Sequence, residues 1–249
     1  MPLYLSVIIP AFNEDKRILD TLGHIHIFIS GLDVESEVVV VDDGSTDSTV
    51  DIVEHAMTCM PGLSIIKYER NRGKGYAFRT GFIRSAGQLV LLCDADLSTP
   101  IEEVGRFIQF VEEGADIVIG SRALKDSKLI RRQPFHRSLM GKTFNKLVRL
   151  LTVGGISDTQ CGFKLFRRDA CLDIFEAQRV ERFAFDAEVL FLARKKGLVI
   201  REEAVSWTNS PESRVRLFTD SSRMLTDLIK VRVDSILGRY DAVKAGRRL

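Results

Sequence analysis

The sequence contains no run of the roughly 18 consecutive apolar residues that a helix needs to cross a bilayer. It also has no apolar leader, since strand-like residues begin near Tyr4, and we therefore expect no secretory signal peptide. From these two absences we expect a cytoplasmic protein that meets a membrane, if it does so at all, only at the surface.

Cysteine and histidine are scarce and scattered. The four cysteines form no C-x-x-C pair and follow no metal-ligand spacing, which indicates isolated thiols in a reducing compartment. The four histidines belong to no HExxH motif. The sequence thus excludes a disulfide framework and a conventional zinc site.

Strong net charge and the common phosphate-loop motifs are also missing. The formal net charge is only +2, so no overall attraction to nucleic acid is expected. Residues 140–143 resemble the end of a P-loop, but the upstream glycine position is His136. A G-x-G-x-x-G motif starting at Gly73 fails because position 78 is Phe. No nucleophile elbow is present.

Short apolar runs alternate with helical patterns through the first half of the chain. In this half we expect strands at 5–10, 37–41, 63–68, 89–92 and 116–119, and helices at 15–29, 76–85 and 101–113, with a further helix that follows Asp47 and ends at Met57. Later in the chain we expect a helix at 181–195 and a strand at 199–207. This alternation predicts an α/β fold with a doubly wound, mostly parallel sheet. We expect one domain over residues 1–210, followed by a basic, amphipathic helical tail over 211–249.

Acidic residues follow three of the predicted strands. Glu14 comes after the first strand, Asp42 and Asp43 after the second, and Asp94 and Asp96 after the wholly apolar run 89–92. In open α/β sheets, ligands bind beyond the carboxyl ends of the strands, so we expect one shared site. Two carboxylates at the end of a buried strand need a positive partner, and Mg²⁺ on a diphosphate suits them.

The chain becomes basic and amphipathic after Arg122. Residues 125–137 indicate a basic loop, and 138–151 and 218–237 predict amphipathic helices. In the second helix, Leu225, Ile229, Val233 and Ile236 form one stripe. Such a stripe is typical of a helix that packs on a core or a second copy, and it also suits a membrane surface.

Several ordered motifs carry a family resemblance. SVIIPAFNE, VVVVDDGSTD, NRGKG, DAD, GSR, DTQCGFKLF and FAFDAE occur in that order between residues 6 and 188. Together they resemble the family 2 glycosyltransferases with the GT-A fold, and among these the enzymes that act on dolichyl or other polyprenyl phosphates. The similarity is greatest to glucosyltransferases, with mannose-transferring enzymes next.

The resemblance implies roles for particular residues. It assigns the nucleotide sugar to Pro10, Ala11, Asn13, Glu14, Asp42, Asp43, Ser45, Lys74, Gly75, Asp94 and Ala95. It makes Asp96, with Asp94, the ligands of Mg²⁺ or Mn²⁺, and it gives Asp96 and Asp158 catalytic parts. Gly73 and Gly75 would let the backbone approach the diphosphate closely. Ser98 stands where mannose-transferring relatives have a stronger side-chain ligand, which leaves the coordination shell open.

The implied reaction moves a sugar from a nucleoside diphosphate to a phosphate acceptor, with inversion at the anomeric carbon. A phosphate monoester is largely ionised at neutral pH, because its second pKa is roughly 6, so it needs cations more than a base. Candidate cations are Arg122, Arg131, Arg132, Arg137 and Lys164.

The resemblance favours UDP-glucose as donor and a polyprenyl phosphate as acceptor, at the cytoplasmic face of a membrane. The alternatives are a GDP-mannose-dependent enzyme, transfer to a saccharide hydroxyl, and a binding protein without catalysis. A homo-oligomer is left open.

Overall fold

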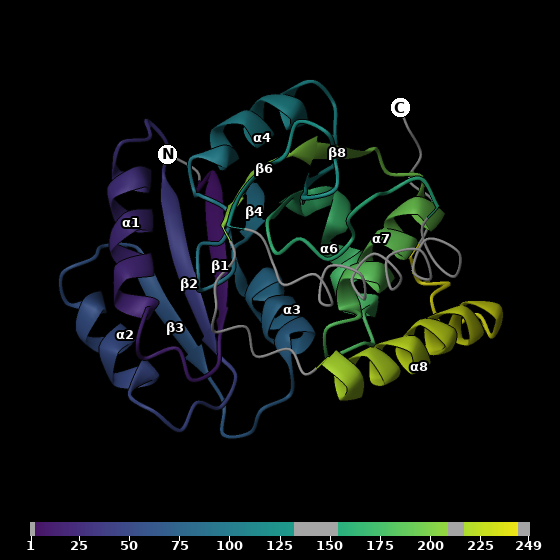
Figure 1. The fold of residues 1–249 in the computed structure, drawn as a ribbon, viewed down its shortest axis with the longest axis horizontal. Helices are drawn as coiled ribbons and strands as arrows, with labels where there is room; N and C mark the ends of the chain where they lie inside the picture. The colour runs from purple at the N-terminus through teal and green to yellow at the C-terminus, as the bar shows by residue number, and fades with distance from the viewer. Residues whose placement is uncertain (1–2, 132–153, 209–216, 244–249) are drawn as a thin grey trace.

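A seven-stranded sheet forms the centre of the protein in the computed structural model, which describes residues 3–131, 154–208 and 217–243 (Figure 1). The strand order is β3-β2-β1-β4-β7-β5-β8. The strands are β1 Leu5–Ala11, β2 Ser36–Asp42, β3 Leu63–Lys67, β4 Leu89–Leu92, β5 Ile117–Ser121, β7 Lys164–Arg167 and β8 Ile200–Ala204. All neighbours pair in parallel except β7, which runs antiparallel to β4 and β5. The predicted mostly parallel sheet is confirmed.

Alternation along the strands divides the apolar side chains between two cores. In β1, Val7 and Ile9 join the core under α1 (Ile18–Ser30), α2 (Thr49–Met57) and α4 (Glu103–Glu112). Ile8 points to the opposite core, which is covered by α3 (Lys74–Arg84), α6 (Arg168–Ala177), α7 (Phe185–Lys196) and α8 (Leu217–Ile236). Helices on both faces explain why these strands are continuous apolar runs.

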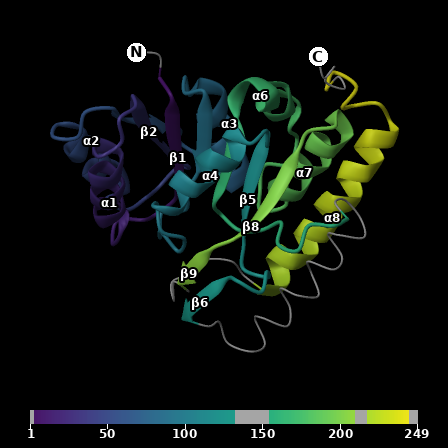
Figure 2. The ribbon, with the colours of Figure 1, turned by 90° about the horizontal axis from the view of Figure 1, so that it is seen from above.

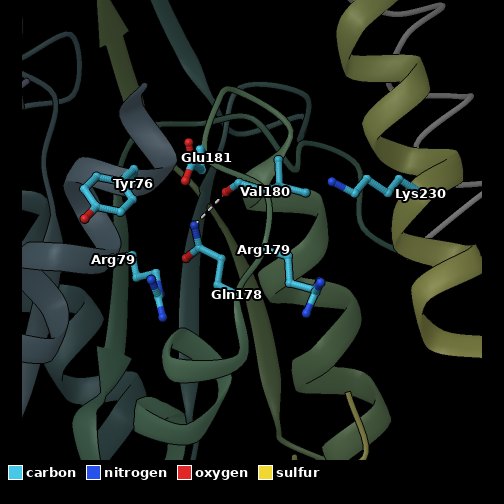
Figure 3. Close-up of a pocket in the computed structure, with 7 residues that line it drawn as sticks. All are labelled: Tyr76, Arg79, Gln178, Arg179, Val180, Glu181 and Lys230. Atoms are coloured by element: carbon cyan, nitrogen blue, oxygen red, sulfur yellow. Dashed lines mark hydrogen bonds between the residues drawn. The ribbon is translucent and has the colours of Figure 1, made fainter. Parts of the chain in front are cut away.

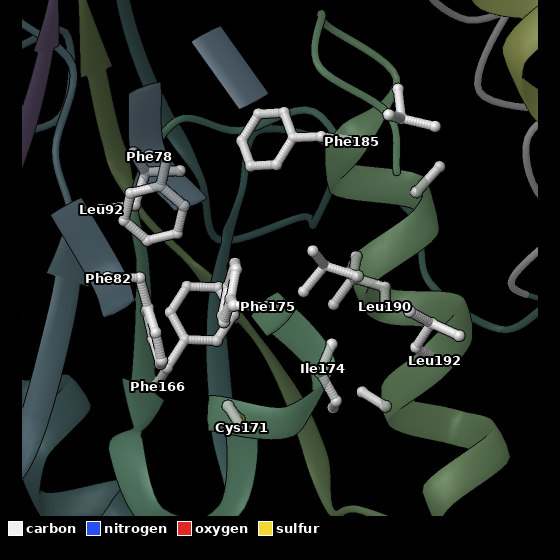
Figure 4. Close-up of a cluster of buried hydrophobic side chains, with 14 of the residues drawn as sticks. Phe78, Phe82, Leu92, Phe166, Cys171, Ile174, Phe175, Phe185, Leu190 and Leu192 are labelled. Atoms are coloured by element: carbon white, nitrogen blue, oxygen red, sulfur yellow. The ribbon is translucent and has the colours of Figure 1, made fainter. Parts of the chain in front are cut away.

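Phenylalanine rings dominate the second core (Figure 4). Phe82 stacks on Phe175 with ring centroids 3.9 Å apart, and Phe166 meets both edge-on. These rings come from α3, α6 and β7, so the cluster fastens the antiparallel strand to the helices that cover it. Offset and edge-to-face pairs of this kind add about 0.5–1.5 kcal/mol beyond their buried area.

The second half of the chain holds the elements that the sequence did not predict. β7 and α6 were missed, and β6 (Lys128–Arg131) lies within the segment predicted as a loop. The strand expected over 199–207 is divided, because the chain leaves the main sheet at Val205. Its continuation, β9 (Ser206–Thr208), pairs with β6 as a separate two-stranded ribbon (Figure 2). The helix predicted at 138–151 lies outside the described residues.

The tail helix α8 uses a different face for packing than the one singled out in the sequence. Met224, Leu228 and Val231 are buried in the second core. Most of the predicted stripe faces outward instead: Leu225 is half-buried, but Ile229, Val233 and Ile236 are 51%, 45% and 84% exposed. The core-packing interpretation of that stripe is therefore wrong.

Buried Glu188 of α7 ties the residues after α8 to the body of the protein. Its carboxylate accepts hydrogen bonds from the Tyr240 hydroxyl at 2.6 Å and from the Val180 and Arg179 amides at 2.8 Å. Burial raises the pKa of Glu188, although these hydrogen bonds act to lower it. The contacts of Glu188 are therefore structural, since each of these bonds runs to the protein itself.

Candidate active site at the carboxyl edge of the sheet

The strand ends that carry acids lie side by side. β1 sits between β2 and β4, with Ala11 opposite Asp42 and Ile8 opposite Leu92. The segments that follow these strands consequently meet at one edge of the sheet. This edge holds Asn13 and Glu14, Asp42 and Asp43, and Asp94 to Asp96, the arrangement that the sequence predicts.

Asp42 combines one bonded and one unbonded carboxylate oxygen. Its Oδ2 accepts hydrogen bonds from the Ser45 amide at 3.0 Å and the Gly44 amide at 3.2 Å, which fixes the turn after β2. Its Oδ1 is buried and has no hydrogen-bond partner among the described residues. A buried acceptor without a partner is costly, so Oδ1 is suited to an N–H or O–H donor of a ligand.

Asp43 binds the glycine-rich turn that precedes α3. Its two oxygens accept the Arg72 and Gly73 amides, each at 2.7 Å. Burial raises the pKa of Asp43, although the two backbone bonds partly offset this rise. Asp43 therefore holds the turn next to Asp42, in addition to any contact with a nucleotide.

A second set of bonds joins the β1 loop to the β2 loop. The Asn13 amide donates to Ser45 Oγ at 2.8 Å, and Asn13 Oδ1 accepts from the Thr46 amide at 2.7 Å. Asn13 has φ +55°, a region that Asn tolerates better than most residues. The Glu14 amide donates to Thr49 Oγ1 at 2.7 Å, and the Ala11 carbonyl accepts from the Asp43 amide at 2.8 Å. Pro10 precedes Ala11 as a half-buried residue.

The carboxylate of Asp94 is enclosed from two sides. Lys74 Nζ lies 2.5 Å from its Oδ1. On the other side stands the backbone of Gly162, where an added Cβ would come within 1.8 Å of Asp94 Oδ2. The predicted residues Lys74 and Asp94 are thus in direct contact, and a glycine without an assigned role makes room for them.

The rest of the D-A-D segment is held by local bonds. The Ala95 carbonyl accepts from Thr21 Oγ1 at 2.7 Å, and Asp96 Oδ1 accepts from the Ser98 amide at 2.9 Å. Between them Leu97 has φ +43°, a conformation that costs a non-glycine residue about 1–3 kcal/mol. Such strain persists only where the surroundings enforce it, and here it accompanies the turn that presents Asp96.

The two aspartates fit a divalent cation that is shared with a ligand. Among the described residues, no group of three His, Cys, Asp or Glu side chains is placed to hold a metal by itself. Mg²⁺ usually takes only one or two protein carboxylates and completes its shell with phosphate oxygen and water. Asp94 and Asp96 can supply that number.

Asp158 is bound to Arg122 in a bidentate pair. Arg122 Nε and Nη2 donate to its two oxygens at 2.6 and 2.9 Å, and the Arg122 amide adds a bond at 3.0 Å. Burial alone would raise the pKa of Asp158, but Arg122 outweighs burial and holds this pKa below its usual range. Asp158 is 1% exposed and is a poor base in this setting, whereas it orients Arg122 firmly.

Lys164 and Asp186 form a second buried pair, at 2.6 Å. The Lys164 ammonium also donates to the Cys161 carbonyl, next to Gly162. Asp186 acts on Lys74 as well: burial works to lower the pKa of Lys74, but the charges of Asp94 and Asp186 outweigh it and raise that pKa. Charges of alternating sign therefore run from Asp94 through Lys74 and Asp186 to Lys164.

The glycines of the 71–75 turn pack against protein. A Cβ at Gly73 would lie 2.6 Å from the Glu181 carbonyl, and one at Gly75 would lie 2.6 Å from Phe185 Cβ. Gly73 also has φ +114°. The glycines were expected to let the backbone approach a diphosphate. Packing against the segment that leads into α7 already requires that these two residues have no Cβ.

The predicted acceptor cations are placed unequally. Arg122 borders the site and keeps Nη1 outside its pair with Asp158, while Lys164 is 1% exposed and engaged with Asp186. Arg131 ends β6, and only its backbone is described. Arg132 and Arg137 lie outside the described residues.

Two further residues shape the site and were missed in the sequence. Trp207 lies under the Arg122 guanidinium, 5.5 Å from ring centroid to Cζ, and shares a small hollow with Asp94 and Gly162. Glu202 accepts the amides of Ser157 and Asp158 at 2.8 Å, which holds Asp158 in place. A single tryptophan is a visible signal in the sequence, but nothing there distinguishes Glu202 from other strand acids.

A larger cleft of about 230 Å³ lies elsewhere, between α3, residues 178–181 and α8 (Figure 3). It contains none of the predicted site residues. It is lined by Tyr76, Arg79, Gln178, Arg179, Val180, Glu181 and Lys230.

Comparisons with known proteins agree with this picture. The profile of glycosyl transferase family 2 matches residues 6–175. The chain is 38% identical to a dolichyl-phosphate beta-glucosyltransferase of Dictyostelium discoideum, over 95% of this chain and 76% of the relative. It is 35% identical to the Saccharomyces cerevisiae protein of the same name, over 96% and 77%.

Solved structures are similar in fold. Glucosyl-3-phosphoglycerate synthase from Mycobacterium tuberculosis, in complex with Mn²⁺ and UDP-glucose, superposes with a TM-score of 0.65 at 19% identity. The match covers 96% of this chain and 79% of that one. At this identity the likeness shows a common fold.

The enclosure of Asp94 can be tested by Gly162→Ala. Its new Cβ would overlap the Asp94 carboxylate, so we expect a loss of about 1–3 kcal/mol in the free energy of unfolding, as for other overpacked sites. Urea unfolding would measure it. Gly105→Ala in α4 is the matched control, because its Cβ meets nothing within 4 Å and alanine favours a helix by about 1 kcal/mol. Equal stability of the Gly162 variant and the parent would contradict the enclosure.

Proposed function

Because the chain belongs to glycosyl transferase family 2, we propose that it transfers glucose from UDP-glucose to dolichyl or another polyprenyl phosphate, with inversion at the anomeric carbon. The observation that carries the proposal is its match to dolichyl-phosphate beta-glucosyltransferases over nearly the whole chain. The GT-A fold expected from the motifs is the fold of its solved neighbours.

The nucleotide would bind along the ends of β1 and β2. Asp42 Oδ1, which has no partner among the described residues, supports this placement, because a pyrimidine N–H or a ribose hydroxyl can donate to it. The bond between Asn13 and Ser45 fixes the loop beside it, where Pro10, Ala11 and Glu14 would border the nucleotide. Asp43 would act mainly by holding the turn that carries Lys74 and Gly75.

The diphosphate would lie over Asp94 to Asp96, with Lys74 close by. Asp96 and Asp94 would hold Mg²⁺ or Mn²⁺ there, and such an ion neutralises charge that develops on a diphosphate leaving group. The Lys74 ammonium, which lies 2.5 Å from Asp94 Oδ1, would add positive charge at the same place. The backbone bond from Ser98 to Asp96 keeps that carboxylate oriented.

The acceptor phosphate would approach Arg122. The guanidinium has donors on both edges, and the pair with Asp158 uses the Nε and Nη2 edge while Nη1 is left for a phosphate oxygen. In this role Asp158 is a positioning residue that acts through Arg122. Arg131, Arg132, Arg137 and Lys164 remain predicted contributors. No group has to remove a proton from an ionised phosphate, which agrees with the lowered pKa of Asp158.

We further propose that α8 rests on the cytoplasmic face of a membrane that contains the acceptor. Of the described helices, none is long and apolar enough to cross a bilayer. The outward stripe of α8, Ile229, Val233 and Ile236, continues into Leu237, which is 60% exposed, and exposed Lys230 and Arg232 flank it. An apolar stripe with basic neighbours suits the interfacial plane.

A donor panel tests the proposed reaction. The protein would be incubated with Mg²⁺ or Mn²⁺, dolichyl phosphate in detergent, and either UDP-glucose, UDP-galactose, UDP-N-acetylglucosamine or GDP-mannose. We expect lipid-linked hexose from UDP-glucose, detected by mass spectrometry. Product from GDP-mannose alone would overturn the donor, and nucleotide release without lipid product would point to a hydroxyl acceptor.

The proposed role of Asp96 as a metal ligand can be tested separately from folding with Asp96→Asn. We expect turnover to fall at least about a hundredfold, the scale of losing one charge-stabilising contact in the transition state. Asp33→Asn, at an exposed surface aspartate, is the matched control and should keep full activity. Thermal unfolding would verify that both variants fold, and undiminished turnover of the Asp96 variant would refute the metal assignment.

Membrane contact by α8 is tested with Ile229→Ser combined with Ile236→Ser. If each side chain contributes about 1.5 kcal/mol by burial in lipid, affinity for phosphatidylcholine–phosphatidylserine vesicles should fall about a hundredfold. Ile27→Ser on α1, 74% exposed, is the control. Unchanged vesicle binding, with loss of a dimer in light scattering, would identify the stripe as a contact between copies instead.

A further inference from the structure

The β6–β9 ribbon stands directly beside the D-A-D segment. The Thr208 amide of β9 donates to the Ser98 carbonyl at 2.8 Å, two residues beyond Asp96. At its other end the ribbon is tied to the chain after β8 by the bond from the Lys128 amide to the Val205 carbonyl at 3.2 Å. The position of the ribbon is therefore fixed by the candidate active site.

Trp207 connects the ribbon to the site chemically. Its ring lies under Arg122, the cation nearest to the proposed acceptor phosphate, and it lines the hollow that also contains Asp94. The residue is only 8% exposed, so the part of the ring that lines this hollow is the apolar surface available beside the place where the phosphate would react.

Two exposed apolar side chains extend this surface outward. Leu129 pairs with Trp207 in the register of the ribbon, so the two side chains share one face. Leu129 is 41% exposed and Ile130 is 71% exposed. The register shifts between Leu129 and Arg131, so Ile130 is the extra residue of an irregularity at which the strict alternation of side chains is broken.

We propose that Trp207, Leu129 and Ile130 form a track for the phosphate-proximal isoprene units of the acceptor. The inference rests on the proposed function and names the contact that the apolar part of that substrate makes. A polyprenyl phosphate has an anionic head joined to an apolar chain, and here a guanidinium adjoins an apolar strip that leads away from the site.

The sole tryptophan of the chain is Trp207, so intrinsic fluorescence reports on the track itself. Farnesyl phosphate and inorganic phosphate would be titrated against the parent and against Leu129→Ser with Ile130→Ser. We expect the variant to bind farnesyl phosphate roughly tenfold more weakly, since part of the burial of two aliphatic side chains is lost. Its response to inorganic phosphate should not change.

Kinetics provide the second measurement. In the same variant the KM for dolichyl phosphate should rise by a similar factor, while the KM for UDP-glucose stays the same. Leu129→Met with Ile130→Val keeps an apolar strip and should restore parent values, and Ile27→Ser is the control for removing an exposed isoleucine.

The outcomes separate this inference from the proposed function. If the parent makes lipid-linked glucose and the serine variant retains parent values for both acceptor measurements, the track is refuted. Equal weakening toward phosphate and farnesyl phosphate would also refute it, because the damage would then lie at Arg122. Loss of vesicle binding in proportion to the rise in KM would identify a bilayer contact in place of a track. Absence of lipid product from the parent would refute the proposed function itself.

Discussion

The position of the Asp94 carboxylate is the constraint on which the site depends. β4 is buried on both faces, and the chain that leaves it places Asp94 at the edge of the sheet with its carboxylate partly exposed. Lys74 from α3 supplies the opposite charge, and Gly162 supplies space. Three segments that are far apart in the sequence therefore meet at the Asp94 carboxylate.

The buried pairs around Asp94 extend this requirement across the molecule. The pairs Lys164–Asp186 and Arg122–Asp158 remove the charges of Lys164, Asp186 and Asp158 from solvent, and each of these charges depends on its partner for compensation. Both pairs also bind backbone: Lys164 holds the Cys161 carbonyl, and Asp158 accepts the Arg122 and Gln160 amides. The segment between Asp158 and Lys164 is thus fastened at both ends, which keeps Gly162 against Asp94. Polar networks of this type specify one arrangement because any partial version leaves a charge unpaired.

The first half of the fold could be predicted because its signals are local. Buried runs such as Leu89–Leu92 are apolar throughout, and the acids that follow them mark the binding edge. β7 could not be predicted, since its four residues KLFR are half charged and its antiparallel partners lie far away in sequence. The Asp158–Arg122 pair spans 36 positions and leaves no local pattern. In α8 the sequence contains two apolar stripes, and only packing on the second core decides that Leu228 is inside and Ile229 outside.

The bond between Tyr240 and Glu188 matters for any shortened or tagged version of this protein, because it ties the residues after α8 to the core. Tyr240 is fully buried, and the carboxylate it meets also fixes the backbone at Val180, one residue before the carbonyl that packs on Gly73. A truncation that removes Tyr240 would leave that carboxylate with one donor fewer inside the core. Removing residues up to Tyr240 would thus disturb, through Glu188, the backbone against which the glycine-rich turn packs. Affinity tags are better attached beyond Val243 than in place of the last described turn.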